Sequence, residues 1–402
     1  MRIVYVTATL PFGREESFVL PEIASMLRRG HEVRVVPIRP RGEIIHREID
    51  AVVKSTVSAP LVSGSVLAGA GRAVSLFGRH AVREVVDLVG HGTSRSRVKN
   101  AAVLPKALWL AAFVETWKPD HIHAHWGSTT ASAAMVASSL TGVPWSFTAH
   151  RWDIAENNRL DAKVSRAAFV RAISADGQRD ILSRVRGAEN LVTLHMGVTV
   201  PAVSSPPPDR TPLTVLVPAS LVAVKGHDVL LRAMARPEPT ELGIRVVLAG
   251  DGPLRPALQE LAVQLGIAER VQFLGHVAHV DLLADLEKGT YDLVALTSNS
   301  SSGEKEGIPV ALMEAMAHTM PVLATDTGGV AELVGGGAGL LIEAANDEAI
   351  ARALCELARN PELRNSLAIA GRQRIEGAFD VESVVDELVR LFADSGGRGQ
   401  TR

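Results

Sequence analysis

The chain has 402 residues, of which 47% are hydrophobic and 21% charged, and its formal net charge is −2. This length and composition are typical of a globular protein with two domains of about 200 residues each. They exclude a membrane-spanning helix, which needs about 18–20 consecutive apolar residues, and the single cysteine, Cys355, excludes an intramolecular disulfide and a multi-cysteine metal site. Because residues 1–6 also lack the layout of a signal peptide, we expect a cytoplasmic protein.

The first half alternates short apolar runs with stretches that carry apolar residues at helical spacing, such as residues 18–29 and 128–140. This alternation predicts a parallel sheet flanked by helices. The predicted strands are residues 3–7, 33–37, 121–125, 144–148, 169–172 and 191–194.

Residues 52–113 fit this alternation poorly, because basic residues are frequent there and the only acidic ones are Glu84 and Asp87. The first 200 residues hold 25 Lys and Arg against 17 Asp and Glu, a net charge of +8, whereas the second half carries −10. Two interpretations stay open. The region could lie on an anionic membrane surface, or its helices could pack on the first domain with a basic face toward solvent.

A proline-rich linker at residues 199–211 precedes a second alternation, whose predicted strands are residues 213–217, 245–249, 271–274, 293–296 and 322–324. We therefore predict an α/β protein with two doubly wound, Rossmann-like domains facing a cleft, with ligands at the carboxyl ends of the strands. The domains are residues 1–198 and 212–378. A last helix, residues 379–395, could pack back on the first domain, and residues 396–402 form a disordered tail.

Residues 306–317 carry the most informative pattern, because Glu314 is the only charged residue from Gly307 to Ala317. Pro309 suits the first position of a helix that is apolar on nearly every face and therefore buried. A buried carboxylate needs a hydrogen-bonding partner, either a ligand diol such as ribose or a protein group. Gly307 allows a ligand to approach the backbone, and the helix N-terminus favours a phosphate.

Two further positions suggest ligand contacts. Lys225 precedes a predicted helix at residues 226–235, where the helix dipole disfavours a cation unless an anion lies between them. His150 follows the predicted strand 144–148, at an edge where such folds place ligand contacts, and Asp153 could cap the following helix.

Together these segments resemble glycosyltransferase family 4, the retaining GT-B group, and especially its exopolysaccharide-type branch. Glu306 and Glu314 match the E-x₇-E motif of the family, and residues 322–333 match the segment that follows it. The other matching landmarks are residues 250–253 and 271–275, Ser17-Phe18 with Glu22, His123-Ala124-His125 and Thr148-Ala149-His150. The resemblance covers about residues 1–390.

The resemblance implies a role for each matching residue. Glu314 would accept hydrogen bonds from the nucleotide ribose, Glu306 would contact the donor sugar, and Lys225 would neutralise the diphosphate. His150 would hydrogen-bond the donor sugar near its 6-hydroxyl. Gly307, Ile308 and Pro309 would bring backbone groups to the sugar and phosphates. The groups that flank the base would come from the turn with Gly250 and Gly252, or from Phe273.

The chain departs from the family pattern at Ser220, where relatives usually have an arginine that shares the phosphate charge. We hypothesise that Arg151 or Arg14 supplies this charge. Gly13 stands where many relatives have a Gly-Gly pair, and Gly13, Asp153 and His125 are further candidate phosphate or acceptor contacts.

We expect no metal and no other cofactor. His121, His123 and His125 point to one face of a strand, but no Cys or carboxylate lies at ligand spacing, and no Asp-x-Asp occurs. The charge of the leaving group would then be stabilised by Lys225 and helix termini.

The predicted function is transfer of a hexosyl group from a nucleoside-diphosphate sugar to a hydroxyl of a lipid-linked saccharide, with retention. A soluble aminocyclitol or natural-product acceptor is the alternative, and a GT-B epimerase or a weakened nucleotide-sugar-binding protein is a second one. The expected partners are the donor and the acceptor, with peripheral contact to an anionic membrane as an option, and no nucleic acid.

Overall fold

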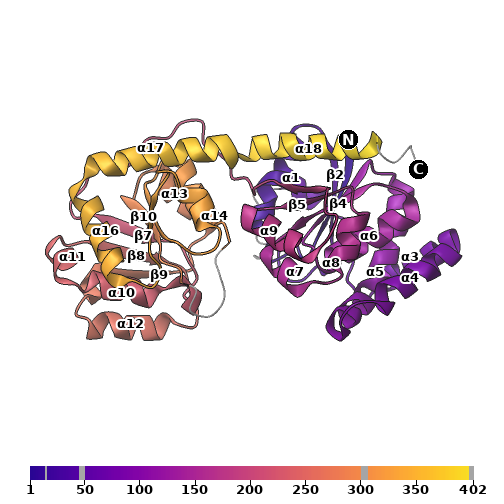
Figure 1. Ribbon diagram of the computed structural model, residues 1–402, viewed down its shortest axis with the longest axis horizontal. Coiled ribbons are helices and arrows are strands. Elements are labelled where there is room, and N and C mark those ends of the chain that lie inside the picture. Colours follow the sequence, from indigo (N-terminus) through magenta and orange to yellow (C-terminus); the bar gives the residue numbers. More distant parts are fainter. Residues whose placement is uncertain (14–15, 45–49, 300–306, 398–402) are drawn as a thin grey trace. The chain divides into compact units, whose positions relative to one another are not determined.

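The computed structural model describes residues 1–13, 16–44, 50–299 and 307–397. The chain divides into two compact units. Unit 1 comprises residues 1–197 together with the C-terminal segment that begins at residue 381, and unit 2 comprises residues 198–380. The chain therefore returns to its first unit after completing the second, as the yellow C-terminal helix in Figure 1 shows.

Unit 1 is built on a six-stranded parallel sheet in the order β2-β1-β3-β4-β5-β6. The predicted α/β class is confirmed, and every strand forms within one or two residues of its predicted bounds. The strands are β1 (Arg2–Thr7), β2 (Glu32–Pro37), β3 (His121–His125), β4 (Trp145–Ala149), β5 (Phe169–Ala172) and β6 (Leu191–Thr193).

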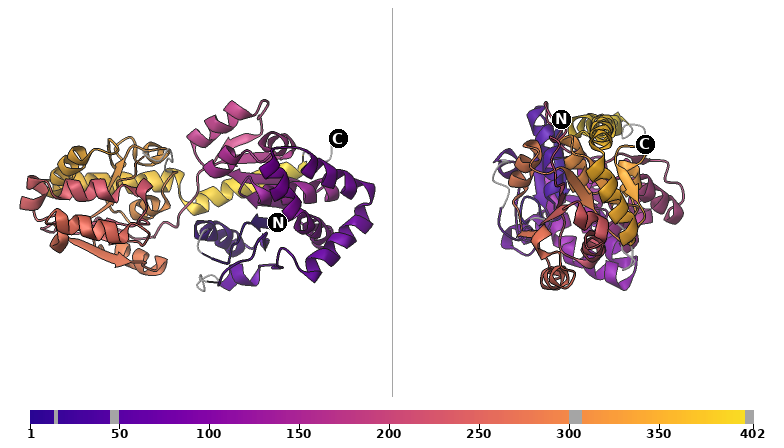
Figure 2. Two further views of the ribbon diagram at one scale, coloured as in Figure 1. Left: turned by 90° about the horizontal axis from the view of Figure 1, so that it is seen from below. Right: turned by 90° about the vertical axis from the view of Figure 1, so that its left-hand side faces the viewer.

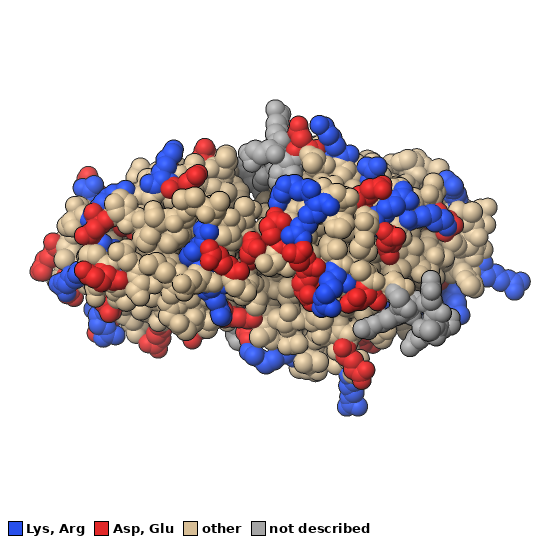
Figure 3. Space-filling model, turned by 90° about the horizontal axis from the view of Figure 1, so that it is seen from above, with Lys and Arg blue, Asp and Glu red and all other residues tan. Residues whose placement is uncertain are grey.

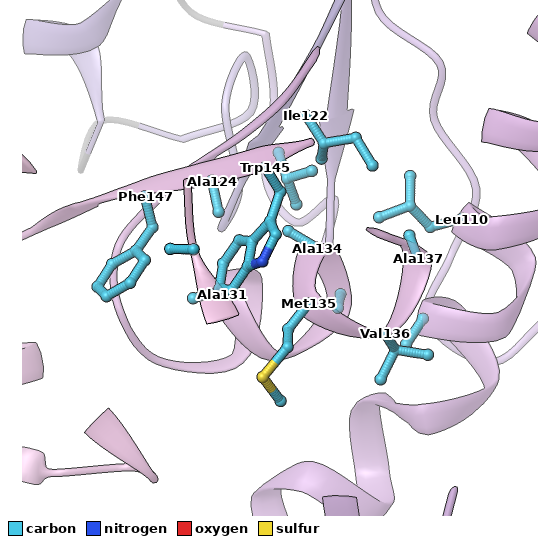
Figure 4. Packing of buried hydrophobic residues seen from close by; sticks show 14 of the residues in the cluster. Leu110, Ile122, Ala124, Ala131, Ala134, Met135, Val136, Ala137, Trp145 and Phe147 are labelled. Carbon is cyan, nitrogen blue, oxygen red and sulfur yellow. The ribbon is translucent and has the colours of Figure 1, made fainter. Parts of the chain in front are cut away.

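Both faces of this sheet are buried, because alternate side chains of each strand point to opposite sides. Val4 and Val6 belong to the core beneath α5 (Ser94–Trp117) and α6 (Thr129–Thr141). Figure 4 shows part of this core, where Trp145, Phe147 and Ile122 of the strands pack against α6 residues such as Met135. Ile3 and Tyr5 point into the opposite core, together with residues of α1 (Leu20–Arg28) and α18 (Val381–Gly397).

The poorly patterned segment 52–113 forms helices that pack on unit 1. α3 (Gly64–Phe77) and α4 (Arg79–Gly90) both lie against α5. The α3–α5 contact is close at Gly69, where an added Cβ would meet the Trp109 ring at 2.4 Å. The remaining helices of unit 1 are η1 (Ser17–Val19), α2 (Asp50–Lys54), α7 (Arg151–Glu156), α8 (Leu160–Arg166) and α9 (Ala175–Arg184).

Helix α18 packs on α1 and contributes Val385, Leu388 and Phe392 to the core of unit 1. Ion pairs from Arg28 and Arg29 to acidic side chains of α18 border this contact. Basic and acidic side chains alternate over this face in Figure 3. The helix continues to Gly397, so the predicted start of a disordered tail at residue 396 was wrong by two residues. The hydroxyl of Ser395 donates to the Leu391 carbonyl oxygen inside this last turn at 2.7 Å.

Unit 2 contains a second six-stranded parallel sheet in the order β12-β11-β10-β7-β8-β9. Five of its strands were predicted. The sixth, β12, has only three half-buried residues after a glycine-rich stretch, which is too short for a periodicity signal. The strands are β7 (Thr214–Val217), β8 (Arg245–Ala249), β9 (Val271–Gly275), β10 (Leu293–Leu296), β11 (Val322–Thr325) and β12 (Leu340–Ile342).

Helices cover this second sheet, and α14, which follows β10 in the chain, packs against both β10 and α17. Within the described residues, none of the helices combines the length and apolarity that a membrane-spanning segment needs. The helices of unit 2 are η3 (Ala223–Lys225), α10 (His227–Met234), α11 (Pro237–Glu241), α12 (Arg255–Gln264), η4 (Ala268–Arg270), α13 (His279–Glu287), α14 (Val310–Ala317), α15 (Val330–Val334), α16 (Asp347–Arg359) and α17 (Pro361–Ala378).

Candidate active site

In unit 1, two predicted site histidines meet at the carboxyl ends of neighbouring strands. His125 ends β3, and His150 immediately follows β4 as the N-cap residue of α7. Their Nε2 atoms lie 2.8 Å apart. The Asp153 carboxylate accepts the backbone N–H of His150 at 3.1 Å, so the prediction that Asp153 caps this helix is confirmed and the cap fixes the start of α7.

A buried hydrogen-bond chain sets the tautomers of these histidines. Tyr5 donates its phenolic proton to the Glu22 carboxylate, and the phenolic oxygen lies 3.4 Å from Nδ1 of His125. Nδ1 of His125 therefore carries the proton that the Tyr5 oxygen accepts, which leaves His125 Nε2 as an acceptor for His150 Nε2–H. Glu22 in turn forms a fully buried ion pair with Arg171, with 2.7 Å between Oε2 and Nη1.

Burial keeps the two histidines neutral. It lowers the pKa of His150 to about 3, helped by the positive charge of Arg171. It also lowers the pKa of His125 well below its ordinary value, and the neighbouring His150 adds to this shift. A neutral pair can orient a ligand hydroxyl by hydrogen bonding without placing a charge beside it.

Aromatic rings surround His150. The ring centroids of Phe18 and Trp126 lie 5.6 and 4.2 Å from that of His150. Trp126 has a backbone φ of +86°, a strained conformation for a bulky residue, directly after β3. Its indole Nε1 donates to the Glu16 carboxylate at 2.6 Å, which helps to hold this conformation.

Glu16 is a site residue that the sequence analysis missed. Its buried carboxylate accepts the backbone N–H groups of Ala8, Thr9 and Leu10 at 2.6 to 2.9 Å and so shapes the loop after β1. The same loop region includes Gly13, whose φ of +73° favours glycine. The available signal was a carboxylate placed just after the end of a strand, at the edge where ligands bind.

Two buried charged side chains, Asp153 and Lys163, contact the turn that follows β3. Lys163 Nζ donates to the carbonyl oxygens of Gly127 and Ser128, both at 2.8 Å. Burial lowers the pKa of Lys163 to about 7 and raises that of Asp153 to about 6. The two side chains thereby hold the turn at Gly127 and Ser128, which directly follows His125 and Trp126.

In unit 2, Glu314 lies on α14 with its side chain 14% exposed, and its Oε1 is 2.7 Å from Nε2 of His279 on α13. The sequence left open whether this carboxylate has a ligand or a protein partner, and the structure supplies the protein partner. Of the residues that the structure describes, none hydrogen-bonds the second oxygen, Oε2. His279 was missed because it lies 35 residues away in sequence.

The start of α14 differs from the prediction by one residue. Pro309 is the N-cap residue with an extended ψ of 117°, and the helix begins at Val310. The Pro309 carbonyl oxygen accepts the N–H groups of Leu312 and Met313, both at 3.1 Å. Before it, Gly307 is exposed with open space at its Cβ position, and Ile308 lies against Gly329.

Glycines pack the strand ends of unit 2 closely together. An added Cβ on Gly250 or Gly252 would meet the carbonyl oxygens of Ala219 or Leu221 at 2.0 and 2.5 Å. The turn containing Ser220 therefore lies directly against residues 250–252. Ser220 is exposed, and its carbonyl oxygen is 3.1 Å from Nε2 of the buried His227.

Lys225 ends the short helix η3 and is followed by Gly226, which has a φ of +64° and is the N-cap residue of α10. A Cβ at Gly226 would meet the Thr297 carbonyl oxygen at 2.1 Å. This contact joins the Lys225 turn to the end of β10, so Lys225, Ser220 and the Gly250 turn all lie at the carboxyl ends of neighbouring strands.

Phe273 lies on β9, and its carbonyl oxygen is 3.3 Å from the guanidinium of Arg255, a third residue that was not predicted from the sequence. Arg151 is the first residue of α7 in unit 1 and is partly exposed. Arg14 and Glu306 lie outside the described residues, so their predicted roles stay predictions.

The strand histidines bond to hydroxyls. Ser146 Oγ lies 2.7 Å from His121 Nε2 and 2.8 Å from His123 Nδ1, and Thr148 Oγ1 lies 3.0 Å from His123 Nε2. In the part of the chain that the structure describes, no group of three or more His, Cys, Asp and Glu side chains is arranged to hold a metal ion.

Two family models match this chain. The glycosyl transferase 4-like domain matches residues 17–197, and the domain of glycosyl transferases group 1 matches residues 203–374. A putative colanic acid biosynthesis glycosyltransferase, WcaL of Salmonella typhimurium, is 23% identical over 422 residues, which cover 98% of this chain and 99% of that protein.

Other relatives match in part. A D-inositol 3-phosphate glycosyltransferase of Rhodococcus opacus is 33% identical over 249 residues, covering 60% of this chain and 54% of that protein. The chain spans about half the length of a Corynebacterium glutamicum GDP-mannose-dependent monoacylated α-(1-6)-phosphatidylinositol monomannoside mannosyltransferase, with 28% identity over 186 residues, 46% of this chain and 48% of that protein.

Among solved structures, Anabaena HepE in complex with UDP-glucose shares the fold with a TM-score of 0.70, at 18% identity over 98% of this chain and 100% of that one. The two parallel sheets, each with polar residues at its carboxyl ends, therefore share the GT-B fold of that structure. The two matches together span most of the chain, which therefore belongs to the family of group 1 glycosyltransferases with a glycosyltransferase 4-like first domain.

Proposed function

We propose that this glycosyltransferase moves a hexosyl group from a nucleoside-diphosphate sugar to a hydroxyl of a lipid-linked saccharide, with retention of the anomeric configuration. The observation that carries this proposal is the end-to-end similarity to the putative colanic acid biosynthesis glycosyltransferase. The phosphatidylinositol monomannoside mannosyltransferase supports an acceptor that combines lipid and sugar, and HepE, bound to UDP-glucose, supports the donor class.

The donor is assigned to the strand ends of unit 2. Glu314 Oε2 would accept the ribose hydroxyls, while His279 holds Oε1 and thereby fixes the carboxylate. Lys225 and backbone N–H groups near α10 and α14 would stabilise the diphosphate without a metal. Gly307 and Gly250 would allow the donor to approach the backbone.

The neutral His150 at the end of β4 would accept one hydrogen bond from a hydroxyl of the transferred sugar through its Nδ1. In the transfer step, the bond between the anomeric carbon and the diphosphate oxygen breaks, and the acceptor oxygen bonds to that carbon from the same face. The departing phosphate takes the proton of the acceptor hydroxyl, so atoms and charges balance. Glu306 would contact the donor sugar on that face.

A second candidate is transfer to a soluble cyclitol. It is favoured by the D-inositol 3-phosphate glycosyltransferase, which has a higher sequence identity over a shorter part of the chain. The site geometry of unit 1 is compatible with either acceptor, because His150 is neutral and the hydrogen bond to His125 leaves its Nδ1 as an acceptor, which suits a hydroxyl of either.

A thermal-shift panel of UDP-, GDP-, dTDP- and ADP-sugars tests the donor assignment on wild type, Glu314→Ala, and the control Glu287→Ala, an exposed glutamate on α13. We expect one nucleotide class to stabilise wild type and the control but not Glu314→Ala. With that donor, transfer to a lipid-linked saccharide and to inositol phosphate is compared, and proton NMR of the product gives the anomeric configuration. No shift with any nucleotide, or an inverted product, contradicts the proposal.

A further inference from the structure

Unit 1 exposes a concentration of large hydrophobic side chains on its two outer helices. On α3 and α4, Leu67, Val74, Leu76, Val82 and Val86 are between 42% and 61% exposed. Half of the strongly exposed large hydrophobic residues in the described part of the chain fall within residues 62–98. Single exposed hydrophobic residues are ordinary, but a concentration on two neighbouring helices indicates a binding surface.

The exposure of these side chains does not reflect an incompletely packed core. The inner faces of both helices are already packed, with Val66, Ala70 and Ala73 of α3 and Ala81 and Leu88 of α4 buried. Gly69 fixes α3 against Trp109 of α5, as described above. In Figure 1 and the left view of Figure 2, the two helices lie at the periphery of unit 1, beyond α5. Their exposed faces therefore point away from the core of their own unit.

Both helices also carry exposed positive charge. Arg72 of α3 and Arg79 and Arg83 of α4 are exposed, and among the described residues none of them forms an ion pair. α3 contains no acidic residue. The acidic residues of α4 pair with α8 and with the residue before it, Glu84 with Arg166 and Asp87 with both Arg166 and Arg159. The exposed hydrophobic side chains are therefore accompanied by arginines that form no ion pair with an acidic side chain among the described residues.

Helical geometry interleaves the two kinds of side chain. At about 100° per residue, Arg79, Val82, Arg83 and Val86 fall within one arc of roughly 100° on α4. Such a stripe can insert valine side chains among acyl chains while the guanidinium groups reach anionic headgroups. A protein partner with only acidic side chains would not require exposed valines between the arginines. An anionic bilayer offers headgroups to the arginines and acyl chains to the valines.

We propose that the α3–α4 surface, centred on the stripe of Arg79, Val82, Arg83 and Val86 on α4, binds the surface of an anionic phospholipid bilayer. This inference extends the proposed function, because a lipid-linked acceptor is held in such a bilayer. Two interpretations of residues 52–113 were left open by the sequence, and this inference favours the membrane surface. The helices pack on unit 1 with their inner faces, and their outer faces lie on the lipid.

Vesicle co-sedimentation of the full chain tests the surface. Vesicles of neutral phosphatidylcholine are compared with vesicles containing 30% phosphatidylglycerol, with the wild type expected to bind only the latter. Arg79→Gln with Arg83→Gln should weaken this binding about 25-fold, about fivefold for each arginine removed. Val82→Gln with Val86→Gln should weaken it about tenfold by removing the inserted side chains.

Matched controls change the same residue types elsewhere. Arg184→Gln with Arg186→Gln removes two exposed cations from unit 1, and Val263→Gln with Ile369→Gln replaces two exposed hydrophobic residues of unit 2. Both controls should bind like wild type. Wild type that binds neutral and anionic vesicles equally, or α3–α4 variants that bind like the controls, would overturn the proposal.

Two measurements on the same samples distinguish the membrane surface from the proposed transferase function and from self-association of the chain. The sugar-nucleotide thermal shift reports the proposed function independently, so a retained shift without vesicle binding overturns the membrane surface alone. Sedimentation velocity reports self-association. If wild type is a dimer that the valine substitutions dissociate, the surface is an interface between two copies of this chain, and the membrane assignment is wrong.

Discussion

The Nε2 atoms of His125 and His150 lie 2.8 Å apart, so one ring must donate to the other. The direction is set from the interior of unit 1, because Tyr5 gives its own proton to Glu22 and leaves its oxygen to accept from His125. His150 therefore presents Nε2–H to His125 and keeps Nδ1 as an acceptor. The buried Glu22–Arg171 pair thus determines which hydrogen bond His150 can offer to a ligand.

Tyr5→Phe should disturb this arrangement without removing either histidine. His125 loses the hydrogen-bond partner of its Nδ1, so both tautomers of the ring become populated. We expect kcat to fall about 10- to 100-fold and KM to change less, as is typical when a group that orients a functional histidine is removed. Imidazole ¹⁵N chemical shifts should report the tautomer change. Tyr291→Phe, which alters the only other tyrosine of the chain, is the control. A variant with native ¹⁵N shifts and reduced kcat would show that Tyr5 acts in another way.

Glu22→Gln should destabilise the protein strongly. It leaves the Arg171 guanidinium, whose side chain is fully buried, without a counter-charge. Loss of one partner of a buried pair costs about 3–5 kcal/mol, and urea unfolding would measure it. The control is Glu382→Gln, since Glu382 pairs with Arg28 and Arg29 at a largely exposed site and should contribute about 1 kcal/mol or less. Equal losses in the two variants would contradict the interpretation.

Gly226→Ala should damage the Lys225 turn. The added Cβ would meet the Thr297 carbonyl oxygen at 2.1 Å, in addition to the strain of a φ of +64°. Gly266→Ala is a close control, because its φ is +69° and no atom lies within 4 Å of its Cβ position. Both variants share the conformational penalty of about 1 kcal/mol, so the extra loss in Gly226→Ala measures the contact. We expect this variant also to lose the nucleotide-induced thermal shift.

Acidic pH should destabilise unit 1 through its buried histidines. Burial lowers the pKa of His121 to about 3. The unfolded chain binds this proton below its ordinary pKa near 6.5, whereas the folded protein does not, so stability present above pH 6.5 is lost progressively toward pH 3. Between pH 7.5 and 5.0, one such group accounts for about 2 kcal/mol.

His121→Asn should flatten this pH dependence by about that amount in urea titrations at the two pH values. His121 is a suitable position because it packs against Phe392 and bonds Ser146, away from His150. An unchanged difference between pH 7.5 and 5.0 would show that His121 is not the group that resists protonation.

The missing arginine at position 220 gives a further prediction. If Arg151 supplies the charge, Arg151→Gln should weaken binding of the nucleoside diphosphate that the thermal-shift panel identifies about tenfold at low salt, and Ser220→Arg should restore it in the double variant. Ser220 is exposed, so the longer side chain can be accommodated. Arg184→Gln serves as the control. An unchanged affinity in Arg151→Gln would leave Arg14 as the remaining candidate of the hypothesis.

Most strands of the two sheets could be predicted because they are short buried runs, as in Leu293–Leu296, where all four residues are buried. β12 could not, because Leu340–Ile342 is only half-buried and too short to establish a period. The 24-residue helix α5 also gave a weak periodicity signal, since its own apolar residues are spread around all of its sides and Pro105 lies inside it.

The site was predictable where one segment carries the pattern, as for Glu314 or for His150 with Asp153. Its partners were not, because they come from distant segments. His279 is 35 residues from Glu314, and Trp126 is 110 residues from Glu16. A single sequence holds no signal for such pairs, which form only when neighbouring strands bring their ends together.

The last helix has a consequence for how the protein is made. Val385, Leu388 and Phe392 of α18 complete the core that contains Ile3, Tyr5 and Phe169. When a ribosome has synthesised all of residues 1–197, these side chains still lack their cover, and they keep lacking it while 183 more residues of unit 2 are translated. The nascent unit 1 therefore presents an open apolar face to chaperones until α18 has been translated, so the unit that begins first is completed after the second.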